Sequence, residues 1–108
     1  MAYRLAQRAE ADLDEIWLYV AKESSSVEIA NRLIDTITDR FFTLARFPYM
    51  GRSREEDLGP GYRSLALGEY VIVYCVENED VLVLRVVHGR RQLARLYRVS
   101  GSKSTYLL

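Results

Sequence analysis

The residues with the clearest chemical potential lie near the end of the chain, in the stretch VLRVVHGRRQLARLY. It holds the only histidine, His88, together with Arg85, Arg90 and Arg91. An imidazole titrates near neutral pH and can act as a general base. Guanidinium groups bind phosphate through paired hydrogen bonds. The stretch could therefore act on a phosphodiester, or it could close a sheet and hold another macromolecule.

Strand alternation separates this histidine from the nearest arginine. In the predicted strand 81–87, successive side chains point to opposite faces of the sheet. One face would carry Leu82, Leu84, Val86 and His88, and the other Val81, Val83, Arg85 and Val87. Arg85 then points away from His88 unless the strand bulges, and Gly89 would permit a bend. We interpret His88 as a hydrogen-bonded residue at the edge of the core in preference to a base.

Arg85 is a lone charge on an otherwise apolar strand. Burying a charge without a partner costs several kcal/mol, so the guanidinium needs a carboxylate or water. Two alternatives follow from the sequence. Arg85 pairs with a carboxylate such as Glu69, or it faces an open cleft.

The charges of the chain are unevenly distributed, although the formal net charge is zero. All fifteen acidic residues lie at or before Asp80. The basic residues from position 85 onward are Arg85, Arg90, Arg91, Arg95, Arg98 and Lys103. An acid-free basic arm is suited to an acidic partner, either nucleic acid or an acidic peptide. The alternative is that these arginines fold back onto acidic helices of the same chain.

Composition excludes several classes of protein. One cysteine and one histidine at unrelated positions make no metal site, and neither a phosphate-binding glycine loop nor a nucleophile motif occurs, so we expect no cofactor. We expect Cys75 to be a buried, inert thiol. No signal peptide is recognisable and no stretch approaches about 18 apolar residues, which favours a cytoplasmic protein that does not enter a membrane. The 108 residues suit one domain, 1–97, with a basic tail, 98–108, that need not be ordered.

Hydrophobic periodicity predicts the elements that would position these residues. A short strand at Tyr3–Leu5 precedes a helix whose apolar stripe runs from Ala9 to Val20. A second helix begins at a capping box, Ser25 with Glu28, and ends at Pro48. Its apolar seam is formed by Val27, Ala30, Ile34, Ile37, Phe41 and Leu44. The two helices should form an antiparallel hairpin.

Residues 49–61 are rich in glycine and charge, which favours a solvated surface loop. Strands are predicted at 62–67, 70–76 and 81–87, and the last two are apolar on both faces, as central strands are. The order β-α-α-β-β-β predicts an α+β fold, with a helical hairpin on one face of a small, mostly antiparallel sheet. We place Trp17, Tyr70 and Tyr74 in its core.

Five segments of the sequence resemble the ParE branch of the RelE/ParE toxin superfamily. They are Ala9-x-x-Asp12-Leu13-x-x-Ile16-Trp17-x-Tyr19, Leu44-x-x-x-Pro48-x-x-Gly51-Arg52, Gly61-Tyr62-Arg63-Ser64-Leu65, Tyr70-Val71-Ile72-Val73-Tyr74 and Leu84-Arg85-Val86-Val87-His88-Gly89-Arg90-Arg91. Each segment is weak alone, but in this order they cover the chain from Tyr3 to about Tyr97. The resemblance implies the RelE/ParE-like fold and a toxin of a bacterial type II toxin–antitoxin module, held inactive by a cognate antitoxin.

The two branches of the superfamily imply different activities. ParE-like toxins bind DNA gyrase and trap its cleaved-DNA intermediate, with no chemistry of their own. RelE-like toxins cut messenger RNA on the ribosome, using basic residues on the sheet and a tyrosine or histidine near the end of the last strand. Here Gly89 follows His88 where some active relatives have tyrosine, and Lys22 and Lys103 both lie outside the predicted sheet. The resemblance therefore favours a gyrase-binding inhibitor over an enzyme.

We expect partner contacts from arginines of the sheet and of the basic arm: Arg63, Arg85, Arg90, Arg91, Arg95 and Arg98. The expected partners are a cognate antitoxin and DNA gyrase, without sequence-specific DNA binding by the toxin alone. The alternative is a ribosome-dependent endoribonuclease, with Arg85, His88 and Arg91 as its catalytic set. A third alternative keeps the fold and the antitoxin contact but has lost toxicity.

Overall fold

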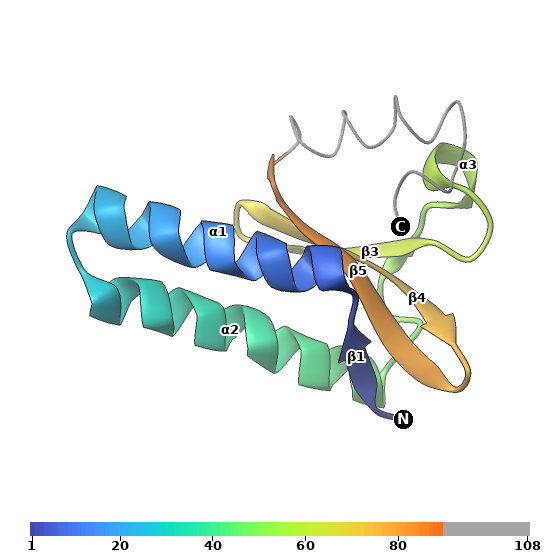
Figure 1. Ribbon diagram of the computed structural model, residues 1–108. Helices are drawn as coiled ribbons and strands as arrows, with labels where there is room; N and C mark the ends of the chain where they lie inside the picture. The colour runs from blue at the N-terminus through green and yellow to red at the C-terminus, as the bar shows by residue number, and fades with distance from the viewer. Residues whose placement is uncertain (90–108) are drawn as a thin grey trace.

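A five-stranded sheet forms the centre of the described part of the molecule. The computed structural model describes residues 1–89 (Figure 1). The strands are β1 (Tyr3–Leu5), β2 (Arg52–Ser53), β3 (Arg63–Leu67), β4 (Tyr70–Glu77) and β5 (Asp80–His88), and the helices are α1 (Gln7–Ser24), α2 (Val27–Arg46) and α3 (Glu55–Leu58). The strand order is β1-β5-β4-β3-β2. Among these strands of residues 1–89, β1 and β5 pair in parallel and the other pairs are antiparallel. The predicted α+β fold is confirmed, with β4 and β5 as central strands.

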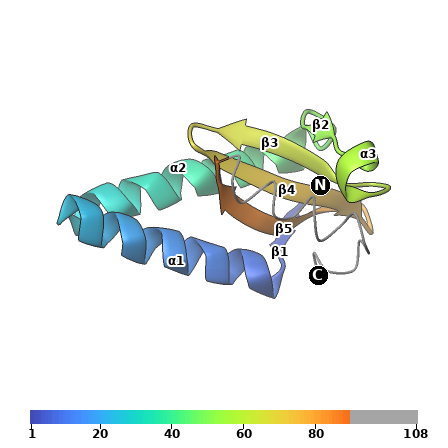
Figure 2. The same cartoon turned by 90° about the horizontal axis from the view of Figure 1, so that it is seen from above.

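The two long helices form the predicted hairpin, but the turn between them differs from the prediction by one residue. Ser25 has a φ of 54°, in the left-handed region that often ends a helix. The N-cap of α2 is Ser26, whose hydroxyl accepts a hydrogen bond from the amide of Ile29 at 3.1 Å. The predicted cap at Ser25 is therefore wrong, because Ser25 serves the preceding helix. Figures 1 and 2 show the closed end of the hairpin projecting beyond the sheet, with α3 at the opposite end of the molecule.

The main core lies between the hairpin and one face of the sheet. Its buried members are Ala9, Ile37, Phe41, Leu44, Tyr70, Ile72, Tyr74, Val81, Val83 and Val86. Tyr70 and Tyr74 are buried as predicted, whereas Trp17 is only half-buried and donates to Asn31 Oδ1 at 2.7 Å. Trp17 therefore links the two helices near the closed end of the hairpin and does not belong to the buried core.

A β-bulge in β5 changes which of its side chains share a face. Val73 lies opposite Arg85 but Tyr74 lies opposite Val83, which leaves Leu84 without an opposite residue on β4. Val81 and Val83 consequently join Val86 in the main core, and Val87 joins a smaller cluster with Leu58 and Val73. The predicted grouping of Val81 and Val83 with Arg85 and Val87 is wrong, because the extra residue inverts the alternation.

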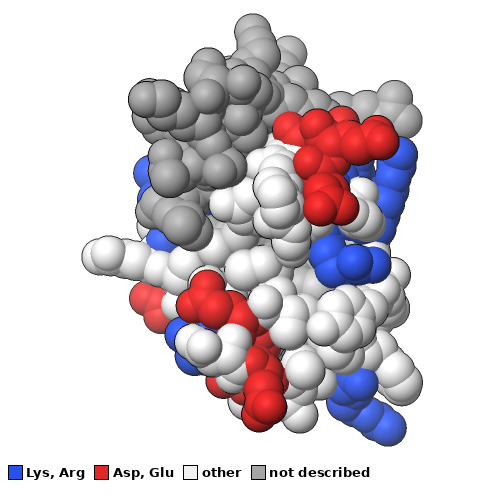
Figure 3. Space-filling model, turned by 90° about the vertical axis from the view of Figure 1, so that its right-hand side faces the viewer, with Lys and Arg blue, Asp and Glu red and all other residues white. Residues whose placement is uncertain are grey.

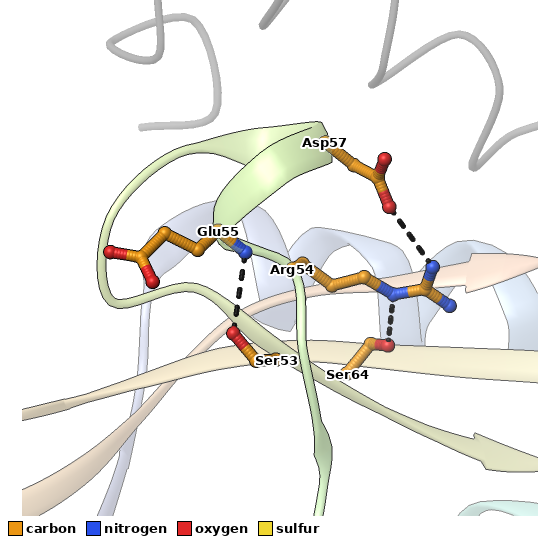
Figure 4. Close-up of polar contacts among 5 residues, drawn as sticks. All are labelled: Ser53, Arg54, Glu55, Asp57 and Ser64. Carbon is orange, nitrogen blue, oxygen red and sulfur yellow. Dashed lines mark hydrogen bonds and ion pairs between the residues drawn. The ribbon is translucent and has the colours of Figure 1, made fainter.

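The predicted loop at 49–61 contains two short elements. β2 pairs with β3 through Arg52 and Ser53, and α3 places the fully buried Leu58 against the smaller cluster. Arg54 holds this segment to the sheet, because its Nε donates to Ser64 Oγ at 2.7 Å and its Nη1 to Asp57 at 3.3 Å (Figure 4). The description as a plain surface loop was therefore incomplete.

Candidate partner-binding site

Arg85 is fixed inside the protein by Asp12 of α1. Its Nε donates to Asp12 Oδ2 at 2.8 Å and its Nη2 to Asp12 Oδ1 at 3.1 Å, and the two side chains are 13% and 8% exposed. The first alternative, pairing with a carboxylate, is therefore confirmed, although the carboxylate is Asp12 and not Glu69. The second alternative is wrong, because the guanidinium does not face an open cleft. A bidentate pair with this little exposure leaves Arg85 few donors for a phosphate or a partner protein.

Asp12 also completes the backbone hydrogen bonding of β5. β1 pairs only with residues 81–83, so from Leu84 onward β5 has no strand neighbour on that side among the described residues. Asp12 Oδ2 accepts from the Val86 amide at 2.9 Å there. One buried carboxylate thus satisfies a side chain and a backbone group that would otherwise be costly to bury.

His88 lies near the surface at the end of β5. Its side chain is 54% exposed, its Nε2 is 3.5 Å from the carboxylate of Glu69, and its ring packs edge-on against Tyr70 at 5.1 Å. Glu69 is 81% exposed, so the pair is well solvated and contributes little to stability. Tyr70 belongs to the main core, and its contact with His88 places the histidine at the edge of that core, as expected. His88 and Arg85 do not converge, since Arg85 is bound by Asp12 of α1 and His88 faces Glu69 in the turn between β3 and β4.

Arg63 holds the segment that joins α2 to β2. Its Nε donates to the carbonyl of Gly51 at 3.1 Å and its Nη2 to the carbonyl of Tyr49 at 3.0 Å. Its guanidinium also lies 5.5 Å from the centre of the Tyr49 ring, within the range of a cation–π contact. Arg63 is therefore a structural residue of this segment as well as a half-exposed cation.

The remaining predicted contact residues, Arg90, Arg91, Arg95 and Arg98, lie outside the described residues. Of the six arginines predicted to contact partners, the structure thus places Arg63 and Arg85. It brings both into intramolecular hydrogen bonds. The predicted tail, 98–108, also lies outside the described residues.

Tyr74 and Gly51 form a buried contact that the sequence analysis did not identify. The Tyr74 hydroxyl donates to the carbonyl of Pro48 at 2.8 Å and accepts from the amide of Gly51 at 2.9 Å. A Cβ on Gly51 would lie 2.5 Å from this hydroxyl and 2.7 Å from the carbonyl of Ser64, so only glycine fits. The available signals were the Pro48-x-x-Gly51 spacing and a tyrosine on an apolar strand, whose hydroxyl needs a partner when buried.

Besides Met1 and Phe42, the large apolar side chains exposed on the described surface fall into two groups. The first group is near the closed end of the hairpin and comprises Leu18, Tyr19, Val27 and Ile29. The second group, which we name the loop patch, comprises Phe47, Tyr49 and Met50, with exposed fractions of 56%, 64% and 46%. Apolar residues exposed close together are candidates for an interaction surface, whereas single exposed ones are ordinary.

The titratable groups with shifted pKa values are not arranged as a reactive centre. Burial raises the pKa of the Cys75 thiol, and nearby Glu77 adds to this rise while Arg4 opposes it. Burial also raises the pKa of Tyr70 and of Tyr62. Within residues 1–89, no three His, Cys, Asp or Glu side chains gather in a way that could hold a metal ion. No helix in this part of the chain is long and apolar enough to cross a membrane.

Comparison with known proteins gives a consistent family. The family of ParE toxins of the type II toxin–antitoxin system parDE matches residues 3–93. Toxin ParE3 of Caulobacter vibrioides is 36% identical over 77% of this chain and 81% of its own length. Toxin ParE1 of Mycobacterium tuberculosis is 32% identical over 86% and 94%. A chain from the chromosomal ParDE system of P. aeruginosa shares the fold, with a TM-score of 0.73, 23% identity, and coverage of 83% of this chain and 97% of that one.

Proposed function

Since the chain belongs to the ParE toxin family of type II toxin–antitoxin systems, we propose that it inhibits DNA gyrase by binding and that a cognate antitoxin neutralises it. One observation of the site carries the choice of binding over catalysis. Arg85, the arginine that an RNA-cleaving centre would place on the last strand, is held by Asp12 and does not meet His88. General acid–base cleavage needs such groups within hydrogen-bond reach of one reacting atom.

The antitoxin would supply an amphipathic, acidic segment. Its apolar side would cover exposed apolar residues near the closed end of the hairpin, such as Leu18, Tyr19 and Ile29. Its carboxylates would pair with arginines as charge-assisted hydrogen bonds. Arg90, Arg91, Arg95 and Arg98 are the proposed contacts on the toxin, because no acidic residue follows Asp80 in the chain.

A gyrase supercoiling assay tests the proposal. Purified protein, shown to be folded by its circular dichroism and cooperative unfolding, is added to gyrase, ATP and relaxed plasmid. We expect loss of supercoiling and accumulation of cleaved DNA, both reversed by prior addition of an equimolar amount of antitoxin. Normal supercoiling and intact DNA in the presence of folded protein would contradict the gyrase assignment.

A ribosome-dependent endoribonuclease is the second candidate, and the exposure of His88 favours it. An imidazole that is 54% exposed could reach a bound RNA and accept a proton. The test replaces His88 by Gln and measures message integrity in translating ribosomes. Message cleavage by the unaltered protein that disappears in the variant would support this candidate, whereas equal toxicity of both proteins would remove His88 from the mechanism.

A further inference from the structure

The backbone of the loop patch is held by hydrogen bonds at almost every residue. The Phe47 amide donates to Thr43 at 2.9 Å, and the Met50 amide donates to the Phe47 carbonyl at 3.1 Å. Tyr74 also binds the Pro48 carbonyl and the Gly51 amide, and Arg63 binds the carbonyls of Tyr49 and Gly51. The loop patch therefore combines a constrained backbone with side chains that remain largely in solvent.

This combination is what a preformed binding surface requires. Binding is weakened by the cost of ordering loops and side chains, and a backbone that is already ordered avoids much of that cost. Within the described chain, a fully buried tyrosine hydroxyl, a glycine without room for a Cβ and an arginine all serve to hold three exposed apolar residues. Burial of those three residues within this chain does not explain the arrangement, because they stay exposed.

The residue types around the loop patch match those of protein interfaces. Interface cores are enriched in Tyr, Phe, Met and Arg and depleted in Lys, Glu and Asp. Arg46 lies 5.6 Å from the centre of the Phe47 ring, and Arg52, two residues after Met50, is exposed. Neither arginine has a carboxylate partner within residues 1–89. On the side of the molecule in Figure 3, uncharged surface lies between basic side chains in the right-hand half of the view.

We propose that the loop patch is a preformed docking site for an acidic segment of the cognate antitoxin, separate from the hairpin surface. Apolar side chains of that segment contact Phe47, Tyr49 and Met50, and its carboxylates pair with Arg46 and Arg52. Charge complementarity identifies the partner, because two cations without a carboxylate partner among residues 1–89 flank an apolar centre in the sequence. The inference rests on the proposed antitoxin partnership and adds a location and a contact chemistry to it.

Nucleic acid fits this surface less well than an acidic peptide. Aromatic rings beside arginines can stack on bases, but such sites lie in a continuous basic groove that follows the phosphates. Here the three acidic residues of α3, Glu55, Glu56 and Asp57, begin three residues after Arg52. Among residues 1–89, Asp57 pairs with Arg54. These carboxylates interrupt the basic surface that a phosphate backbone would have to follow, whereas a peptide can place its few carboxylates at Arg46 and Arg52.

The test measures antitoxin affinity for charge-reversal and truncation variants of the full chain. Arg46→Glu is compared with Arg8→Glu, which makes the same charge change on an exposed residue of a different helix. We expect Arg46→Glu to weaken binding about tenfold or more and Arg8→Glu less than about twofold, since energetic contacts are concentrated in few residues. Phe47→Ser with Met50→Ser should also weaken binding about tenfold or more, because these side chains form the apolar centre.

Unfolding midpoints in urea establish that each variant is folded, and gyrase inhibition is measured in parallel. If the unaltered chain fails to bind the antitoxin encoded beside it, the antitoxin partnership fails and this inference with it. If the unaltered chain binds but Arg46→Glu and the double serine variant bind equally well, only this inference is overturned. Variants that keep antitoxin affinity but lose gyrase inhibition would assign the loop patch to the target and would also overturn it.

Discussion

Arg85 and His88 lie three residues apart on β5, yet their surroundings differ completely. Arg85 is 13% exposed and donates two hydrogen bonds to Asp12, which also accepts a hydrogen bond from the amide of Val86. His88 is 54% exposed and faces Glu69, which is itself 81% exposed. The type of a polar residue on a strand therefore does not by itself reveal the role of that residue. Its neighbours decide whether it stabilises the fold or is available to a partner.

The largest effect on the free energy of unfolding is expected for the buried pair of Arg85 and Asp12. Asp12→Ala leaves a nearly buried guanidinium and the Val86 amide without their acceptor, so it should reduce the free energy of unfolding by about 3–5 kcal/mol. Urea unfolding followed by circular dichroism measures the change. The control is Arg4→Ala, which removes a solvated ion pair with Asp80 and should cost under about 1 kcal/mol. Equal effects of the two substitutions would show that the Asp12–Arg85 pair is not a buried structural contact.

The hydroxyl of Tyr74 is a second buried polar group, and its contribution to stability can be compared with that of Arg85. Tyr74→Phe removes the hydroxyl that joins Pro48 to Gly51 and leaves a carbonyl and an amide unsatisfied, which should cost about 1–3 kcal/mol. The same unfolding measurement applies. Tyr70→Phe is a suitable control, because Tyr70 lies on the same strand and in the same core cluster. A Tyr74→Phe protein as stable as the unaltered chain would contradict the role assigned to this hydroxyl.

Gly51→Ala tests the same contact from the other side. The added Cβ would meet Tyr74 and the backbone of Ser64 at less than 3 Å, so the loop or the strand must move, at a cost of about 1–3 kcal/mol. Gly61→Ala is not a matched control, since Gly61 has a φ of 84° that an alanine adopts with strain. The appropriate control is the Gly51→Ala, Tyr74→Phe double variant, in which the removed hydroxyl relieves the closest contact. Additive losses in the double variant would argue against that clash.

The His88 end of the comparison should give almost no effect on stability. His88→Gln and Glu69→Gln each replace a solvated side chain, so the free energy of unfolding should change by no more than about 0.5 kcal/mol. Growth inhibition on induction should also be unchanged by His88→Gln if the protein acts by binding. A large loss of toxicity in a stable His88→Gln protein would contradict action by binding alone, because His88 would then be a reactive residue.

The smallest effect concerns Cys75. Burial raises its thiol pKa above the ordinary 9.0, so less thiolate is present in the folded protein than in the unfolded chain at the same pH. Iodoacetamide at pH 8 should therefore modify the native protein more slowly than the urea-unfolded protein. The stability that this difference in pKa contributes is fully present below the thiol pKa of the unfolded chain. It is lost as the pH rises through the higher thiol pKa of the folded protein. A native thiol that reacts as fast as the unfolded one would show that Cys75 is not protected.

Periodicity was sufficient to predict the fold because its signals are local. The seam of α2 predicted a helix whose members Ala30, Ile37, Phe41 and Leu44 are all fully buried. Val27, also assigned to that seam, is 56% exposed because it lies at the start of the helix, near the projecting end of the hairpin. The short elements β2 and α3 were missed, since two and four residues are too few for a periodic pattern to appear.

The site was harder to predict because its contacts join distant parts of the chain. The partner of Arg85 lies 73 residues earlier in the sequence, whereas Glu69, in the turn between β3 and β4, is nearer to Arg85 along the chain. Alternation alone could not reveal the bulge at Leu84, because a bulge is defined by pairing with β4. The sequence was sufficient to place His88 at the end of a strand and β5 in the interior of the sheet. The first follows from position along the strand, and the second from apolar content.

The central claim is that this protein acts by binding and does not itself cleave RNA or DNA. The most direct measurement adds the unaltered chain and His88→Gln, in parallel, to gyrase with relaxed plasmid and to ribosomes translating a labelled message. We predict that both proteins block supercoiling and accumulate cleaved DNA to the same extent, while the message stays intact. Undisturbed gyrase, together with a message that the unaltered chain cuts and His88→Gln does not, would contradict the claim.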